Sequence, residues 1–128
     1  MRENFPDGTL YESRVGYSRA VRVGNQVFVS GTVAWGEDGT LVAGGAYEQA
    51  RQVIANIEAA LQRAGASLSD VVRTRVYVTD LAHVEGAGRA HSEAFDAIRP
   101  ASAMLVIAAI AAPGMVVEIE ADAVIAGA

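Results

Sequence analysis

The chain of 128 residues contains no cysteine, which excludes disulfide bonds, a thiolate nucleophile and a metal site built on thiolates. It has only two histidines, so a metal centre with several imidazole ligands has little support, and no metal is expected. Charged residues are few, 20% of the chain, and the formal net charge is -5. Nucleic acids and anionic membranes are polyanions, so we do not expect this chain to bind them.

Long apolar runs are also missing. No stretch reaches about 18 uninterrupted apolar residues, the length that a membrane-spanning helix requires. The first ten residues, MRENFPDGTL, lack the apolar centre of a signal peptide, so a cytoplasmic location is expected. The composition does include 52% apolar residues, which is enough to build the core of one globular domain spanning residues 1–128.

Turn dipeptides and apolar periodicity predict the first elements of this domain. Residues 21–23 and 27–32 are rich in β-branched side chains and flank the turn dipeptide Gly24-Asn25, which is typical of a β-hairpin. Residues 46–64 and 83–98 then place apolar side chains at helical spacing, so each is predicted to form an amphipathic helix. His91 falls on the apolar stripe of the second helix and is interpreted as a core histidine.

The rest of the chain is predicted to form strands. Residues 71–78, VVRTRVYV, are β-branched and aromatic. Residues 104–112 and 115–126 are interpreted as two strands joined by a turn at Pro113-Gly114. The predicted order is ββαβαββ, an α+β fold in which two helices pack on one face of a sheet.

The opposite face of that sheet needs another partner, because each helix has a single apolar stripe. Residues 102–109 are mostly apolar at both odd and even positions, the pattern of a strand covered on both sides. A chain of this length has no further element to cover them. We therefore expect a homo-oligomer whose subunits bury the sheet faces that the helices leave bare.

Carboxylates occupy every second position of the last strand, at Glu118, Glu120 and Asp122, which places them on the face away from the helices. Arg73 and Arg75 alternate in the same way on the strand at 71–78. If these two strands are neighbours, opposite charges face one another across them. We interpret Arg73, Arg75, Glu120 and Asp122 as an ion-pair ladder. Glu118 is not assigned to this ladder.

Four segments carry a family resemblance: GYSRAVRVGNQVFVSG, DVVRTRVYVTDL, RPASAM and PGMVVEIEADAV. In this order, over about residues 12–126, the chain resembles the RidA/YjgF family of reactive-intermediate deaminases. The resemblance implies a chorismate-mutase-like fold and a homotrimer with a small-molecule cleft at each of three subunit interfaces. It also implies hydrolysis of 2-imino and enamino acids to 2-keto acids and ammonia, a role in metabolite damage control, without a cofactor.

The resemblance assigns roles to four residues. Glu118 stands where the family keeps a water-positioning glutamate, and Tyr17 stands at a second catalytic position. Ser30 and Gly31 match the segment that lines the cleft. The presence of these four residues predicts that the protein retains the ligand cleft of the family.

Three ligand-contacting positions depart from the family pattern. Ser102 follows the Pro-Ala pair at the place where the family has a carboxylate-anchoring arginine. Met104 replaces a frequent cysteine, and Gly88 falls where an asparagine is common. A hydroxyl does not reproduce the paired contact of a guanidinium with a carboxylate, so the chain resembles the branches of the family that lack this arginine.

Several alternatives remain open at this point. Arg19 lies two residues after Tyr17, so it is expected either to supply the missing cation or to be an ordinary surface or ion-pairing residue. The protein is predicted to be an imine or enamine deaminase acting without the usual anchor, or a ligand-binding or scavenging trimer without turnover. Endoribonuclease activity, a description attached to parts of the family, is the weakest alternative, because the chain is acidic.

Overall fold

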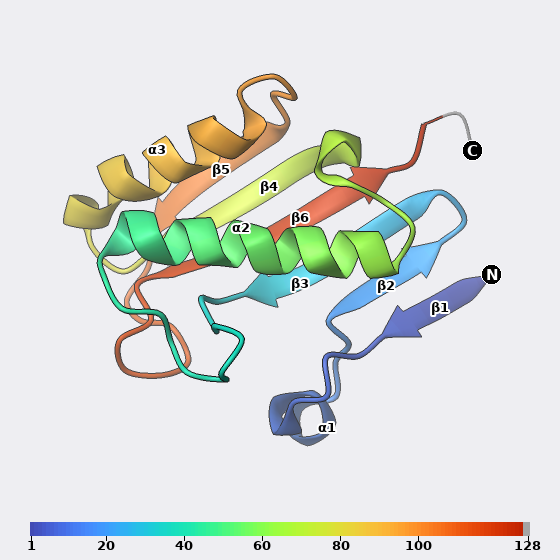
Figure 1. Ribbon diagram of the computed structural model, residues 1–128, viewed down its shortest axis with the longest axis horizontal. Coiled ribbons are helices and arrows are strands. Elements are labelled where there is room, and N and C mark those ends of the chain that lie inside the picture. The colour runs from blue at the N-terminus through green and yellow to red at the C-terminus, as the bar shows by residue number, and fades with distance from the viewer. Residues whose placement is uncertain (127–128) are drawn as a thin grey trace.

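The computed structural model describes residues 1–126 as a six-stranded sheet with two long helices on one face (Figure 1). The strands are β1 (Arg2–Phe5), β2 (Ala20–Val23), β3 (Gln26–Thr32), β4 (Val71–Val78), β5 (Ala101–Val106) and β6 (Val117–Val124). The helices are α1 (Leu10–Val15), α2 (Ala46–Arg63) and α3 (Val84–Phe95). Short 3-10 turns, Leu68–Asp70 and Leu81–His83, precede β4 and α3.

The strand order in the sheet is β1-β2-β3-β6-β4-β5. All neighbouring strands are antiparallel except β4 and β5, which are parallel because α3 connects them. The last strand, β6, therefore inserts between β3 and β4 in the middle of the sheet (Figure 1).

The core lies between the sheet and the helices α2 and α3. In α2, residues at helical spacing such as Val53, Ile57 and Leu61 are fully buried, which is why this segment packs as a helix on the sheet. Gly65, with a φ of +86°, then ends the helix in a left-handed conformation that a glycine adopts without strain. Phe95, the last residue of α3, is also buried in this core.

The predicted α+β class, with two helices on one face, is confirmed. The hairpin of β2 and β3, the strand at 71–78 and both long helices lie where the sequence patterns place them. The structure adds β1 and α1, which were not predicted because four residues and six residues respectively give too short a periodic pattern.

The last two strands differ from the prediction in their bounds and in what joins them. β5 begins and ends earlier than expected, at Ala101 and Val106, and residues 107–116 form an irregular connection. β5 and β6 do not pair with each other, since β4 lies between them. Apolar runs on either side of Pro113-Gly114 look like a hairpin, but the crossover through α3 places β5 at the edge of the sheet.

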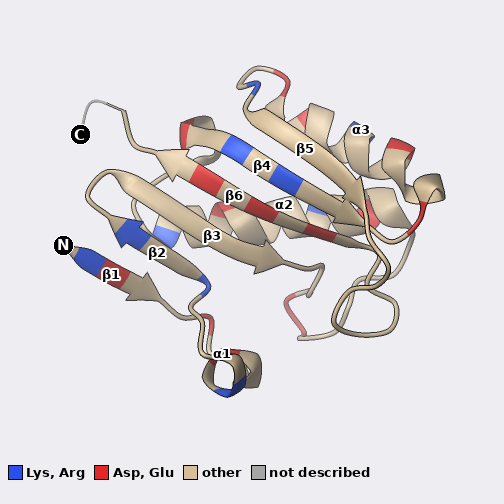
Figure 2. Ribbon diagram, turned by 180° about the vertical axis from the view of Figure 1, so that it is seen from behind, with Lys and Arg blue, Asp and Glu red and all other residues tan. Residues whose placement is uncertain are grey.

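Charged residues alternate with uncharged ones along β4 and β6, as Figure 2 shows from the side opposite the helices. Val117, Ile119 and Ala121 of β6 are fully buried against the helices, so the intervening carboxylates point away from them, as predicted. Exposed apolar side chains, Phe28 and Leu105, share the uncovered face with these charges. None of the helices within residues 1–126 has the length and apolar character needed to cross a bilayer.

Candidate functional site

Part of the predicted ion-pair ladder forms between β4 and β6: Arg75 makes ion pairs, whereas no salt bridge of Arg73 occurs among residues 1–126. Arg75 lies opposite Glu120 in the strand register, and its Nη1 is 3.1 Å from Glu120 Oε1 and 3.4 Å from Asp122 Oδ2. Arg73 lies opposite Asp122. Side chains in the Arg75 pairs keep about a third of their surface exposed, 38% for Arg75 and 32% for Glu120, so their contribution to stability is modest, about 0.2 to 1 kcal/mol.

Glu118 differs from its two neighbours on the strand. Within residues 1–126 it forms no salt bridge, and its cross-strand partner on β4 is Tyr77 rather than an arginine. Burial, with the negative charge of Glu120 beside it, raises the pKa of Glu118 above the ordinary 4.5, although Arg19 acts in the opposite direction. A raised pKa makes a carboxyl group a better proton acceptor than an ordinary carboxylate, as a general base requires.

Gly31 on β3 gives the Glu118 carboxylate the room that it occupies. A Cβ atom added at Gly31 would overlap with Glu118 Oε2. The regular pairing of β3 with β6 is also interrupted between Val29 and Thr32, so the strand backbone is displaced at this point. The carboxylate therefore lies directly against the backbone of the Ser30-Gly31 segment that was predicted to line the cleft.

Arg19, which directly precedes β2, contacts the same segment of β3. Its Nη1 donates to the carbonyl oxygen of Gly31 at 2.8 Å and to Thr32 Oγ1 at 2.9 Å, and its Nε pairs with Asp7 at 3.0 Å. The guanidinium carbon also lies 5.6 Å from the centre of the Tyr17 ring. Arg19 is thus an ion-pairing residue that also contacts Gly31 and Thr32, and its alternative role as the missing cation for a ligand stays a prediction.

Asp7 and Glu12 anchor the loop around Arg19. Burial raises the pKa of Asp7, but hydrogen bonds from Thr9 and Arg19 outweigh it, so the net pKa is below the ordinary 3.8. The buried carboxylate of Glu12 accepts hydrogen bonds from the backbone N–H groups of Asp7, Gly8 and Arg19. These contacts tie α1 to the irregular segments on either side of it, and no sequence pattern indicated them, because the donors are backbone groups outside helices and strands.

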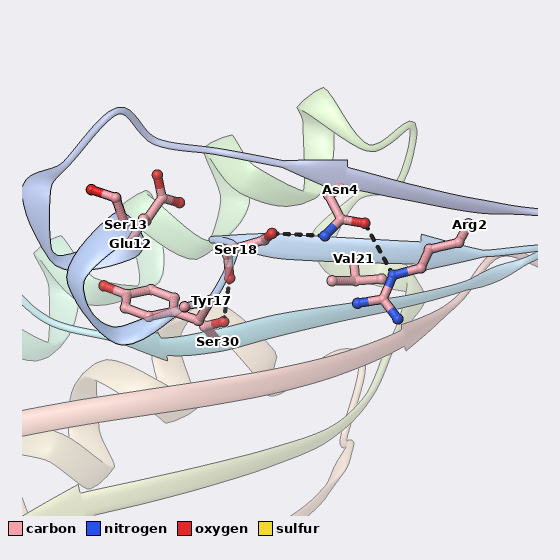
Figure 3. A pocket seen from close by; sticks show the side chains of 9 residues that line it. Arg2, Asn4, Glu12, Ser13, Tyr17, Ser18, Val21 and Ser30 are labelled. Atoms are coloured by element: carbon pink, nitrogen blue, oxygen red, sulfur yellow. Dashed lines mark hydrogen bonds between the residues drawn. The ribbon is translucent and has the colours of Figure 1, made fainter.

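Tyr17 and Ser30 line a pocket of about 550 Å³ beside this cluster (Figure 3). Ser30 Oγ donates to the carbonyl oxygen of Ser18 at 2.6 Å, and Asn4 Nδ2 donates to Ser18 Oγ at 2.9 Å. Arg2 lies at the other end of the pocket from Tyr17 (Figure 3). Neither Gly31 nor Glu118 is among the lining residues, so the pocket adjoins the Glu118 cluster and does not contain it.

Tyr77 is a candidate that the sequence interpretation missed. It is opposite Glu118 in register, and burial together with the charge of Glu120 raises the pKa of its hydroxyl above 10.0. The signal was present, since Tyr77 continues the alternation of Arg73 and Arg75 by two more residues. Its hydroxyl stays protonated at neutral pH, and a hydrogen bond to Glu120 contributes to this shift.

Ser102, Met104 and Gly88 lie on the other side of the sheet. Ser102 pairs in register with Thr74, whose side chain is completely buried under the helices, and Met104 follows on the same face of β5. Gly88 on α3 is close to Met104, since a Cβ added there would be 3.9 Å from the methionine methyl carbon. One chain therefore holds the predicted site residues in two groups on opposite faces.

The residues described, 1–126, contain no group of three or more His, Asp or Glu side chains arranged to hold a metal ion. His91 is half-buried and packs against Phe95 at a ring-centre distance of 4.7 Å, in agreement with its interpretation as a core residue.

Comparisons with known proteins agree with this fold. Residues 9–125 match the family model described as endoribonuclease L-PSP. The crystal structure of a Mycobacterium tuberculosis member of the YjgF/YER057c/UK114 family has a TM-score of 0.88 and 46% sequence identity, covering 98% of this chain and 100% of that one. Fold and sequence therefore define a small α+β domain of the L-PSP class. The chain belongs to the RidA/YjgF family.

Two further relatives carry functional information in their own descriptions. A mouse protein named 2-iminobutanoate/2-iminopropanoate deaminase is 36% identical over 109 residues, which are 84% of this chain and 80% of the mouse protein. The crystal structure of Escherichia coli TdcF with bound serine has a TM-score of 0.82 and 26% identity, covering 96% of this chain and 94% of that one.

Proposed function

We propose that the protein hydrolyses imine- or enamine-type metabolites in the cytoplasm, without the arginine that anchors a substrate carboxylate in the family. The observation that carries this proposal is Glu118, a half-buried carboxyl group with a raised pKa that lies against Gly31 and outside the ion-pair ladder. The deaminase name of the mouse relative and the serine bound to the Escherichia coli protein support a small nitrogen-containing substrate.

The chemistry follows from the side chains that are available. The chain contains neither lysine nor cysteine, so a Schiff base with a lysine or a thiol adduct with a cysteine is excluded, and water, the second reactant of a hydrolysis, is taken as the nucleophile. Glu118 accepts a proton from that water as it attacks the carbon of the protonated C=N bond, giving a neutral tetrahedral carbinolamine. Return of that proton to nitrogen makes ammonia the leaving group, and the hydroxyl group gives its proton back to Glu118 as the C–N bond breaks and the C=O bond forms.

The two groups of site residues require a second copy of the chain. Glu118 and Gly31 lie on the uncovered face, whereas Ser102 and Met104 lie on the helix-bearing face of the edge strand β5. A single subunit cannot bring both groups to one small ligand. A homotrimer in which the edge of one subunit meets the uncovered face of the next would join them, in the manner that the family resemblance implies.

Paired substitutions of two carboxylates test the proposed activity. We expect Glu118→Gln to lower the rate of ammonia release from enamine substrates by a factor of about 100 or more, because the proton-transferring group is lost. Glu120→Gln removes the same charge two residues away, from the Arg75 ion pair; it lowers the pKa of Glu118 only in part, because burial is the larger cause, and should reduce the rate far less than Glu118→Gln. Equal losses in both variants would contradict the assignment of Glu118.

A ligand-binding protein without turnover is the second candidate, favoured by Ser102 at the position of the anchoring arginine. In that case keto acids or their neutral analogues would raise the melting temperature, but no enamine would release ammonia. Endoribonuclease activity is supported by the description of the family model and by those of two similar crystal structures, but the carboxylates of β6 would repel the phosphates of RNA.

A further inference from the structure

Three hydroxyl and imidazole groups form a hydrogen-bonded chain that runs from beneath α3 to the edge of the sheet. His91 Nε2 is 2.8 Å from Thr74 Oγ1, and Thr74 Oγ1 donates to Ser102 Oγ at 2.8 Å. Thr74 is completely buried, whereas Ser102 lies on the exposed edge strand β5. The chain therefore links a buried side chain to a surface where a ligand can arrive.

The direction of these hydrogen bonds is determined by counting protons. A hydroxyl group has one proton to donate, and Thr74 donates its proton to Ser102. Thr74 must therefore accept from His91, so the Nε2 atom of His91 carries the ring proton. Ser102 Oγ in turn receives a hydrogen bond and, among residues 1–126, gives its own proton to no other side chain. That proton is available to an incoming acceptor.

The surroundings of Ser102 favour a neutral ligand group. Burial lowers the pKa of His91, so its ring is neutral at neutral pH. The next side chain on this face of β5 is the apolar Met104, and Gly88 faces it from α3. Arg99, which precedes β5, is paired with Asp96 at 2.8 Å. A carboxylate placed here would lose hydration and receive a single neutral donor in exchange.

We propose that Ser102 is a specificity-determining hydrogen-bond donor for a neutral acceptor on the substrate, a carbonyl of the amide or ester class, and that Thr74 and His91 position its hydroxyl. The inference rests on the proposed function, because it places the ligand of the shared cleft against Ser102. It extends that function by naming a substrate class, compounds whose carboxyl end is an amide or ester.

Two probes of nearly equal size, pyruvamide and pyruvate, separate a neutral acceptor from an anionic one. Calorimetric titration of the intact oligomer should show tighter binding of pyruvamide. Ser102→Ala should weaken pyruvamide binding about fivefold, the effect of one neutral hydrogen bond, with little effect on pyruvate. Ser102→Arg should reverse the preference, since a guanidinium binds a carboxylate in a paired contact.

Thr74→Val tests the positioning role, because valine keeps the shape of threonine and removes its hydroxyl. We expect this variant to lose part of the pyruvamide preference, and the Thr74→Val, Ser102→Ala double variant to bind no more weakly than Ser102→Ala alone. In the unsubstituted protein, nitrogen NMR shifts should show the proton of His91 on Nε2, a readout that needs no ligand.

Stronger binding of pyruvate than of pyruvamide, or an unchanged preference in Ser102→Ala, would overturn the proposal. So would a failure of both probes to bind, or a His91 ring protonated on Nδ1. These results would not bear on the proposed hydrolysis, which is judged separately by ammonia release in the Glu118→Gln and Glu120→Gln variants.

Discussion

At the scale of single residues, Glu118 and Glu120 have the same chemistry and face the same side of one strand, yet their environments differ. Glu120 has Arg75 at 3.1 Å, so its charge is compensated. Glu118 is opposite Tyr77 and lies against Gly31, where burial disfavours ionisation. The site thus depends on which cross-strand neighbour each carboxylate meets.

The raised pKa of Glu118 predicts a pH-dependent stability. A carboxyl group whose pKa is higher in the folded state than in the unfolded state keeps its proton to higher pH when the protein is folded. The stability therefore falls as the pH rises from the ordinary pKa of 4.5 through the raised pKa of the folded state. Glu118→Gln should therefore raise the melting temperature at pH 7 but not at pH values below 4.5. A melting temperature that drops at pH 7 in this variant would contradict the prediction.

Glu120→Gln is the matched control for that measurement. It breaks the partly exposed ion pair with Arg75 and should lower stability at neutral pH by about 0.2 to 1 kcal/mol, with a loss that shrinks in high salt. Glu118→Gln and Glu120→Gln should therefore change the melting temperature at neutral pH in opposite directions.

At the scale of the elements, β4, α3 and β5 form the unit that carries the Ser102 group of residues. The parallel pairing of β4 with β5 brings Thr74 beside Ser102, and α3 lies over both strands so that His91 can reach Thr74. The helices α3 and α2 pack closely at Gly86, whose α carbon faces the backbone at the start of α2.

Two glycines of α3 provide a test of that packing. A methyl group at Gly88 would meet only Met104, at 3.9 Å, so Gly88→Ala should stabilise the protein by about 0.5 to 1 kcal/mol through helix propensity. At Gly86 the same methyl group would lie 3.0 Å from the Tyr47 backbone nitrogen, so Gly86→Ala should be destabilising. Urea unfolding of both variants measures the difference, and a stabilised Gly86→Ala would refute the close contact.

At the scale of the whole molecule, the uncovered sheet face combines ion pairs with exposed apolar side chains. Phe28 and Leu105 are 43% and 47% exposed, and both lie on the same face as the Arg75 ion pairs. Large apolar side chains together on one face are typical of a surface that binds a partner. The proposed trimer would cover them and complete the site at the same time.

Oligomerisation is tested by placing a charge on that face. We expect sedimentation equilibrium to show a trimer for the unsubstituted protein and dissociation for Leu105→Glu, because an uncompensated carboxylate would be buried in the interface. Ala59→Glu adds the same charge to the exposed side of α2 and should leave the trimer intact. A monomer in the unsubstituted protein would rule out the proposed assembly.

The sequence by itself determined the elements with long periodic patterns, α2, α3 and β4, and the face on which Glu118, Glu120 and Asp122 point. These features depend on the spacing of side chains along a single helix or strand, and that spacing can be read locally. The family motifs likewise indicated Tyr17, Ser30, Gly31 and Glu118, although whether these residues act in catalysis stays a prediction.

The tertiary structure alone decided which segments meet. It placed β6 between β3 and β4, paired Glu120 with Arg75 and left Glu118 against Gly31. It also joined His91 to Ser102 through Thr74, three residues on three different elements. The physical reason is that a strand's pattern specifies its buried face but not its neighbour, which is chosen by the packing of the whole sheet and its crossover.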